Sequence, residues 1–165
     1  FSERNFLFFY TNYIKAGKSF KPGYFGSSLF IDGEMVNGVN NTSGELTGLL
    51  RPNDPPLLSE QDLKDLKNIN GPLTPALKNL GLWILPWLES LSSYSDPGCI
   101  VMAGSLCWQN ELLLAEMNEL LNSRLNRSKN REIRITRAQS PVHGVAYGAA
   151  ITLLDHLAPE LLEKD

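Results

Sequence analysis

The best candidates for functional residues follow a tight turn at Asp32-Gly33. Asp-Gly between strand-forming residues is typical of a two-residue β-hairpin, in which both turn residues take positive φ. Beyond this hairpin, Gly38 and Gly44 would expose their backbone, and the Glu45 carboxylate could accept hydrogen bonds from hydroxyl groups of a ligand. An acid after glycine is more often a solvated loop residue. The pattern therefore leaves open a ligand-facing loop and an ordinary surface loop.

Other catalytic and metal-binding patterns find little support. His143 and His156 accompany no Gly-x-Ser-x-Gly nucleophile motif, and we expect both on a loop or a helix surface. Cys99 and Cys107 lack the spacing of a zinc site or a redox pair, so they are expected to be buried free thiols. The sequence therefore predicts no catalytic residue, no metal and no cofactor. The turn at residues 103–105 ends an apolar strand, where open α/β sheets bind ligands.

Length and charge set the broad class. A chain of 165 residues is long enough for one domain with a real core. Its net charge of −3 gives no general attraction to nucleic acid or to anionic lipid. The sequence shows no signal peptide and no run of about 20 apolar residues, which favours a cytoplasmic protein without a membrane partner. Because strand-like sequence begins near Phe1, we expect that another segment precedes it.

The first half of the chain predicts strands followed by helices. A continuous run of strand formers at 6–11 predicts a central strand buried on both faces. The Gly-, Lys- and Pro-rich segment 15–26 predicts a loop. Two capped helices follow, at 60–69 after Ser59 and from Pro75 after Thr74.

The second helix carries a buried stripe and two tryptophans. The stripe consists of Leu77, Leu80, Ile84, Leu88 and Leu91. Pro86 interrupts the backbone hydrogen bonding of this helix and should bend it. Trp83 and Trp87 lie one turn apart, and packing is favoured over a ligand platform.

The second half predicts two strand-helix units. An apolar strand at 99–103 precedes a helix at 109–125, whose inner face carries Leu113, Met117, Leu120 and Leu121. Alternating residues at 131–137 predict an edge strand, and small residues at 144–150 open a last helix. Such units imply parallel strands, so the hairpin would form the antiparallel side of a mixed sheet.

Three stretches of the sequence together resemble the ROK family of sugar kinases and sugar-responsive repressors. Gly26, the Leu-Phe-Ile-Asp-Gly of 29–33, Gly38 and Gly44-Glu45 stand at matching places of the family's hairpin. Residues 95–105 resemble its strand-and-turn motif, and residues 144–150 resemble its closing helix. The resemblance implies an α/β fold: a ribonuclease H-like (actin-like ATPase) lobe with a mixed five-stranded sheet. Residues 1–165 would form the C-terminal lobe, without the N-terminal lobe or any DNA-binding domain.

Departures from the family argue against phosphoryl transfer. The family's phosphate loop falls on residues 22–26, where a proline and two aromatics replace small residues. A family histidine falls on Gly48, and the zinc-binding cysteine run is absent. Four positions would then belong to a degenerate nucleotide site: Gly26, Ser27, Gly104 and Ser105.

The resemblance thus implies the sugar-binding and dimerisation lobe of a NagC/XylR-type transcriptional regulator without kinase activity. Glu45, helped by the backbone at Gly44, would contact a sugar or sugar phosphate, with the missing lobe forming the other wall. DNA would be reached only through an upstream domain, and a homodimer is expected. The alternatives are the C-terminal lobe of a ROK sugar kinase and a ligand-free interaction domain.

Overall fold

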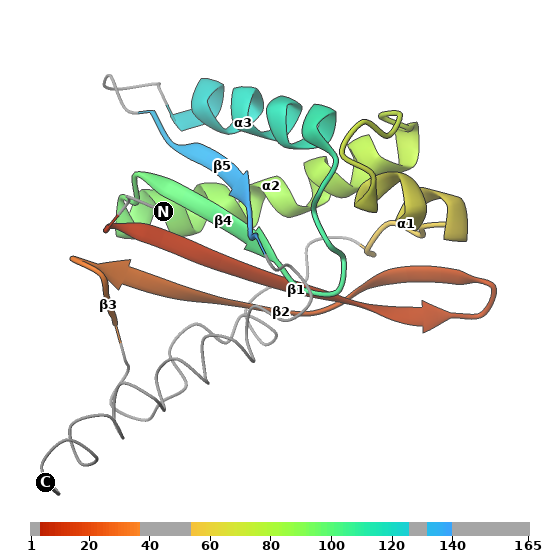
Figure 1. Ribbon diagram of the computed structural model, residues 1–165, viewed down its shortest axis with the longest axis horizontal. Helices are drawn as coiled ribbons and strands as arrows, with labels where there is room; N and C mark the ends of the chain where they lie inside the picture. The colour runs from red at the N-terminus through yellow and green to blue at the C-terminus, as the bar shows by residue number, and fades with distance from the viewer. Residues whose placement is uncertain (1–3, 37–53, 126–131, 140–165) are drawn as a thin grey trace, which may run out of the picture.

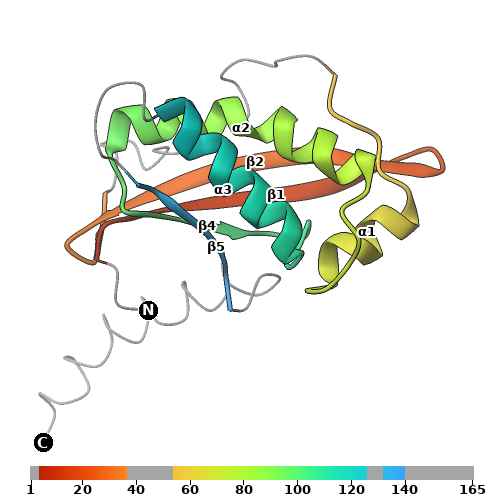
Figure 2. The same cartoon turned by 90° about the horizontal axis from the view of Figure 1, so that it is seen from above.

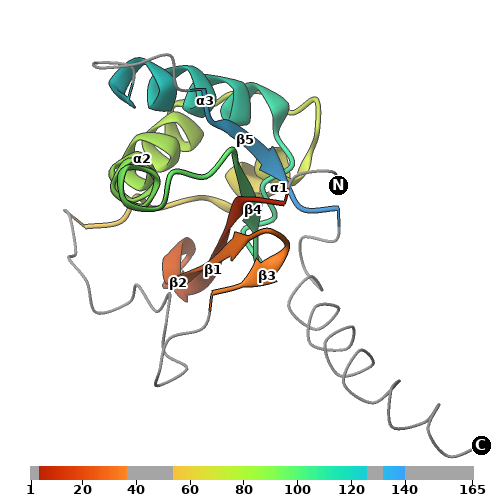
Figure 3. The same cartoon turned by 90° about the vertical axis from the view of Figure 1, so that its left-hand side faces the viewer.

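A mixed sheet covered by helices on one face dominates the computed structural model, which describes residues 4–36, 54–125 and 132–139 (Figures 1 and 3). Within these residues the sheet has five strands in the order β3-β2-β1-β4-β5. Their bounds are β1 Phe6–Ala16, β2 Ser19–Ile31, β3 Glu34–Met35, β4 Cys99–Ala103 and β5 Arg134–Arg137. β1 to β3 pair antiparallel, whereas β4 pairs parallel with both β1 and β5. The predicted mixed sheet with an antiparallel hairpin side is confirmed.

Two hairpins build the antiparallel side, and only one of them was predicted. Asp32 and Gly33 take φ values of 54° and 86° between β2 and β3, which confirms the tight turn. The segment 15–26, predicted to be a loop, instead turns at Gly17 and continues as most of β2. Its prediction as a loop is wrong because pairing along β1 holds these Gly, Lys and Pro residues in an extended conformation.

β1 is central in the sheet, but only one of its faces is fully buried. Leu7, Phe9 and Thr11 point to the helices and are buried, whereas the alternate residues are half-buried. On that second face Phe6 stacks on Phe30 with ring centroids 4.4 Å apart. The prediction of burial on both faces is therefore wrong for β1. Burial on both faces occurs instead in β4, which is buried along its whole length.

The caps of the first two helices are bonded to one another. α1 (Glu60–Lys67) begins with a capping box in which the Asp62 carboxylate accepts from the Ser59 N–H at 2.9 Å and the Ser59 hydroxyl at 2.6 Å. α2 (Pro75–Ser95) begins at Thr74, whose hydroxyl accepts from the Leu77 N–H and donates to Asp62 at 2.9 Å. Both predicted caps are confirmed, and Asp62 serves both.

The buried stripe of α2 packs against α3 (Glu111–Leu125). The two helices lie side by side over the sheet (Figures 2 and 3). The predicted stripe is buried except for Leu91, which is half-buried. Gly81 allows a close approach, since a Cβ there would lie 3.0 Å from Leu113 and 3.1 Å from Met117. Pro86 lies inside α2 on its exposed side.

A wholly buried asparagine fixes the start of α3. The Asn110 amide donates to the carbonyl oxygens of Asp65 and Gly71, and its Oδ1 accepts from the Leu113 N–H at 2.9 Å. Asn110 therefore caps α3 and ties it to the α1–α2 connection. No described helix has the length and hydropathy needed to cross a bilayer.

The double cap predicts an acid-sensitive contribution of Asp62 to stability. Burial raises the pKa of this carboxyl, but hydrogen bonds from Ser59 and Thr74 outweigh it and hold the pKa below its ordinary value of 3.8. A group with a lowered folded-state pKa contributes stability above its unfolded-state pKa and loses it as the pH falls through the folded-state pKa. Asp62→Asn should therefore cost about 1 kcal/mol near pH 7, with a smaller difference from the wild type below about pH 3.5.

Urea unfolding at several pH values measures this difference. Asp54→Asn is the matched control, because Asp54 is exposed and lies before the capping box. The control should follow the wild type throughout. A constant difference between Asp62→Asn and the wild type from pH 7 to pH 3 would contradict the linkage.

Candidate functional site

The predicted sugar loop lies outside the described residues. Gly38, Gly44, Glu45 and Gly48 all fall in residues 37–53, and His143, His156 and the helix predicted from residue 144 fall in residues 140–165. Their predicted roles stay predictions. The degenerate nucleotide-site positions are described, and the structure places each of them.

Gly26 and Ser27 lie inside β2, in register with Tyr10 and Phe9 of β1. The family's phosphate loop was matched to residues 22–26, and this segment is strand rather than loop. Within this segment β2 carries one extra residue, because Thr11 pairs with Phe25 whereas Tyr13 pairs with Pro22.

Pro22 fits this bulged strand because β2 is an edge of the described sheet at that point. β3 pairs only with Phe30 and Ile31, so no described strand needs a backbone N–H from Pro22. The Pro22-Gly23 pair of this segment therefore marks an edge bulge in a strand.

The turn after β4 packs directly against the part of β1 that lies opposite the β2 bulge. Gly104 has φ 106°, and a Cβ at this position would lie 1.9 Å from the Thr11 carbonyl oxygen. The Trp108 indole N–H donates to the Thr11 hydroxyl at 2.7 Å, and both residues are wholly buried. Glycine at 104 is thus required both by backbone conformation and by space.

The N–H groups of residues 105–107 in this turn donate hydrogen bonds within the protein. The bonds run from Ser105 N–H to Asn12 Oδ1 at 3.1 Å, from Leu106 N–H to Thr11 O at 3.4 Å and from Cys107 N–H to Gly104 O at 2.9 Å. The Ser105 hydroxyl is also engaged, since it accepts from the Tyr13 N–H at 3.1 Å. Phosphate-binding turns need N–H groups that are free to point at the anion. In this conformation the N–H groups of Ser105 and Leu106 hold β1 instead, and that of Cys107 closes the turn on itself.

The two halves of the predicted degenerate nucleotide site lie on either side of β1. Gly26 pairs with Tyr10 on one side of β1, and Ala103, just before Gly104, pairs with Tyr10 on the other. Two strand spacings, about 10 Å, separate these backbones. β1 therefore stands between the positions that sequence reasoning grouped.

The tryptophans of α2 pack on β2, as predicted. Phe25 has its ring centroid 5.6 Å from that of Trp83 and 5.4 Å from that of Trp87. Trp87 is buried, and its indole N–H has no hydrogen-bond partner. The aromatic cluster fills the space between helix and sheet.

Both cysteines are buried free thiols, as predicted. Burial raises the pKa of Cys107, against the opposing effect of Lys67, and so disfavours a reactive thiolate. The Lys67 ammonium instead lies 5.6 Å from the centre of the Tyr13 ring. The described residues hold no cluster of three or more metal-ligating side chains.

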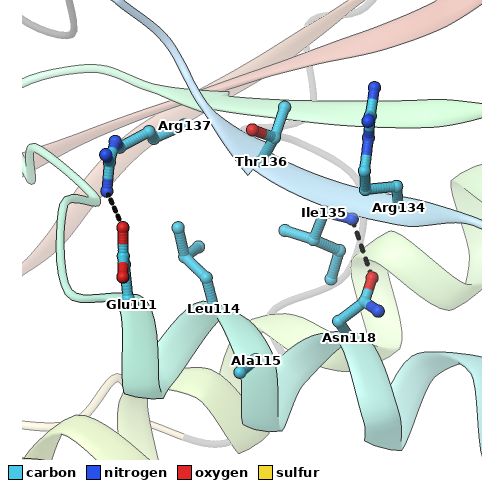
Figure 4. Close-up of a pocket in the computed structure, with 8 residues that line it drawn as sticks. All are labelled: Glu111, Leu114, Ala115, Asn118, Arg134, Ile135, Thr136 and Arg137. Atoms are coloured by element: carbon cyan, nitrogen blue, oxygen red, sulfur yellow. Dashed lines mark hydrogen bonds and ion pairs between the residues drawn. The ribbon is translucent and has the colours of Figure 1, made fainter.

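A groove of about 350 Å³ runs between α3 and β5, and none of the predicted site residues lines it (Figure 4). Leu114 and Ile135 point toward its middle (Figure 4). The Arg137–Glu111 ion pair, 3.0 Å long, spans it at one end. At the other end the Ile135 N–H donates to Asn118 Oδ1 at 2.8 Å. Sequence reasoning missed this groove, to which α3 contributes Asn118 beside Leu114 and Ala115.

No protein-family model and no curated protein matches the sequence. Solved structures do match the fold. A ROK hexokinase from Thermus thermophilus gives a TM-score of 0.60 at 18% identity, over 92% of this chain and 59% of that one. A ROK family protein from Streptococcus pneumoniae TIGR4, in complex with sucrose, gives 0.62 at 15% identity, over 96% of this chain and 61% of that one.

A transcriptional regulator shares the fold as well. A ROK family regulator described as a homologue of the E. coli MLC protein gives a TM-score of 0.52 at 13% identity, over 81% of this chain and 41% of that one. The chain spans about 60% of the length of the two structures above and less of the regulator. It therefore has the actin-like fold found in ROK kinases and in a ROK regulator.

The contact between the β4 turn and β1 predicts a severe effect of Gly104→Ala. The substitution adds a methyl group against the Thr11 backbone and places alanine at a φ that it disfavours. It should therefore cost at least about 3 kcal/mol of unfolding free energy. Gly17→Ala is the control, because Gly17 also has positive φ but nothing lies within 4 Å of an added Cβ. It should cost only about 1–2 kcal/mol. Urea unfolding measures both, and equal losses would show that the clash contributes nothing.

Proposed function

We propose that this chain is the C-terminal lobe of a ROK-type protein and that it serves a NagC/XylR-like, sugar-responsive transcriptional regulator. Its fold, shared with ROK kinases and with a ROK regulator, supports the family. The sequence motifs at 26–45, 95–105 and 144–150 support it independently. The lobe would bind a sugar effector and take part in dimerisation, and it would have no kinase activity.

One observation carries the choice of regulator over kinase: residues 105–107 of the turn donate their N–H groups to β1 and to Gly104. Transfer of a phosphoryl group depends on positioning the phosphates and on stabilising their charge. The segment matched to the family's phosphate loop, residues 22–26, lies in β2 and carries a buried proline. Neither segment offers a free, flexible, glycine-lined loop.

The proposed sugar contact is the Glu45 carboxylate, with the backbone at Gly44 beside it. A carboxylate accepts hydrogen bonds from two neighbouring hydroxyls, which suits a sugar or a sugar phosphate. The structural likeness to a sucrose-bound ROK protein supports this ligand class. The other wall of the cleft would come from an N-terminal lobe outside this sequence.

The remaining parts of the proposal follow the family. DNA would be contacted only by an upstream domain, since this chain carries a net charge of −3. The protein would act in the cytoplasm as a homodimer without a membrane partner. Closure of the two lobes around the sugar would shift the arrangement of the DNA-reading domains.

A ROK sugar kinase remains the second candidate, favoured by the likeness to the Thermus thermophilus hexokinase. A third is a ligand-free interaction domain that has kept the fold. The three candidates differ in turnover and in sugar binding, so two measurements distinguish them.

The first measurement is phosphoryl transfer by the protein that contains this chain. With ATP and a panel of hexoses and N-acetylhexosamines, ADP release should not exceed the rate without sugar. The reason is that residues 105–107 donate their N–H groups within the fold and residues 22–26 lie in β2. A ROK hexokinase assayed in parallel verifies the conditions. Sugar-dependent ADP release would favour the kinase and overturn the regulator proposal.

The second measurement is sugar binding by calorimetry on the same protein. Glu45→Ala should weaken the effector about 10- to 100-fold, because a hydrogen bond to a charged group contributes about 1.5–3 kcal/mol. Glu34→Ala is the matched control, since Glu34 is exposed in the two-residue strand β3. Binding should survive in the control. No heat with any sugar or sugar phosphate would favour the interaction domain.

A further inference from the structure

β5 lies at the edge of the described sheet and needs partners for its outer backbone groups. Its inner side pairs with the neighbouring strand: the Arg134 N–H donates to Gly98 O at 3.3 Å, and the Ala138 N–H donates to Met102 O at 2.9 Å. The alternate residues Ile133 and Ile135 direct their N–H groups outward. Such a row of unpaired groups is a template for pairing with a strand of another chain.

Two asparagine side chains of α3 form hydrogen bonds with these outer groups. Asn122 binds both backbone groups of Ile133, accepting from its N–H at 2.8 Å and donating to its carbonyl oxygen at 2.8 Å. Asn118 Oδ1 accepts from the Ile135 N–H at 2.8 Å, and Figure 4 shows this bond. A primary amide presents the same donor and acceptor as a peptide group, so these side chains reproduce the contacts of a strand.

The spacing of the two asparagines matches the spacing of the strand. Residues four apart on a helix lie on one face and are about 6 Å apart along its axis. Residues two apart on a strand are about 6.6 Å apart. α3 can therefore place one amide at each outward N–H of β5. The bonds at Ile133 are sheltered, because Ile133 is wholly buried.

We propose that Asn118 and Asn122 act as a substitute strand that closes the β5 edge to pairing with a second copy of this chain. Beyond Asn118 the Arg137–Glu111 ion pair and a 3.4 Å bond from Arg137 to the Gln109 carbonyl hold the strand end against the start of α3. The edge is thus held by α3 side chains from Ile133 to Arg137. A homodimer of this protein then forms through another surface.

A pair of substitutions at Asn118 tests the bond directly. Asn118 uses only its Oδ1 toward β5, so Asn118→Asp keeps an acceptor and Asn118→Leu removes it. Amide hydrogen exchange followed by NMR should show the Ile135 N–H exchanging about three- to tenfold faster in Asn118→Leu than in the wild type. Asn118→Asp should remain near the wild type, and amides of β1 should be unchanged in both.

The double variant Asn118→Leu/Asn122→Leu tests the consequence. At rising concentration it should form larger assemblies than the wild type by size-exclusion chromatography with light scattering, while Asn118→Asp keeps the wild-type mass. A folded double variant with the wild-type mass at all concentrations would overturn the proposal. If the double variant does not fold, the exchange data decide: unprotected Ile133 and Ile135 amides in the wild type would overturn it equally.

Discussion

The contact between Thr11 of β1 and the turn after β4 is the constraint on which the rest of the structure depends. Thr11 is wholly buried, its carbonyl accepts from the Leu106 N–H, and its hydroxyl accepts from the Trp108 indole. Gly104 makes this approach possible because any Cβ would collide with the Thr11 backbone. The contact fixes where the chain leaves the sheet after β4, and Asn110 then fixes where α3 begins.

The same contact links the fold to the proposed loss of catalysis. The carboxyl end of a parallel strand is where α/β sheets bind phosphates with free N–H groups of the following turn. Here the extra residue in β2 accompanies a stretch of β1 whose Asn12 side chain and Thr11 carbonyl take up the turn N–H groups. The N–H groups of Ser105 and Leu106 are thereby bonded within the protein, whereas phosphoryl transfer depends on groups that position the phosphates and stabilise their charge.

Local signals in the sequence predicted the parts of the fold that local chemistry determines. Asp32-Gly33 and the caps at Ser59 and Thr74 were found because each involves residues within three positions of one another. The strand at 19–26 was missed because pairing with β1, a non-local interaction, outweighs the loop composition of that segment. The grouping of Gly26 with Gly104 stays a prediction: the two glycines lie on opposite sides of β1, an arrangement that a linear motif does not show.

Asn118 and Asn122 show why the sequence pattern did not predict how the β5 edge of the sheet is covered. Amphipathic periodicity counts an asparagine as a polar residue that favours solvent, yet both amides are bonded to β5. Asparagine is also a weaker helix former than leucine or glutamate, so these positions lose helix propensity. That loss is offset by bonds that leave Ile133 and Ile135 without free outward N–H groups. Residues that oppose the local preference of their own helix are thus explained by their hydrogen bonds to the neighbouring strand.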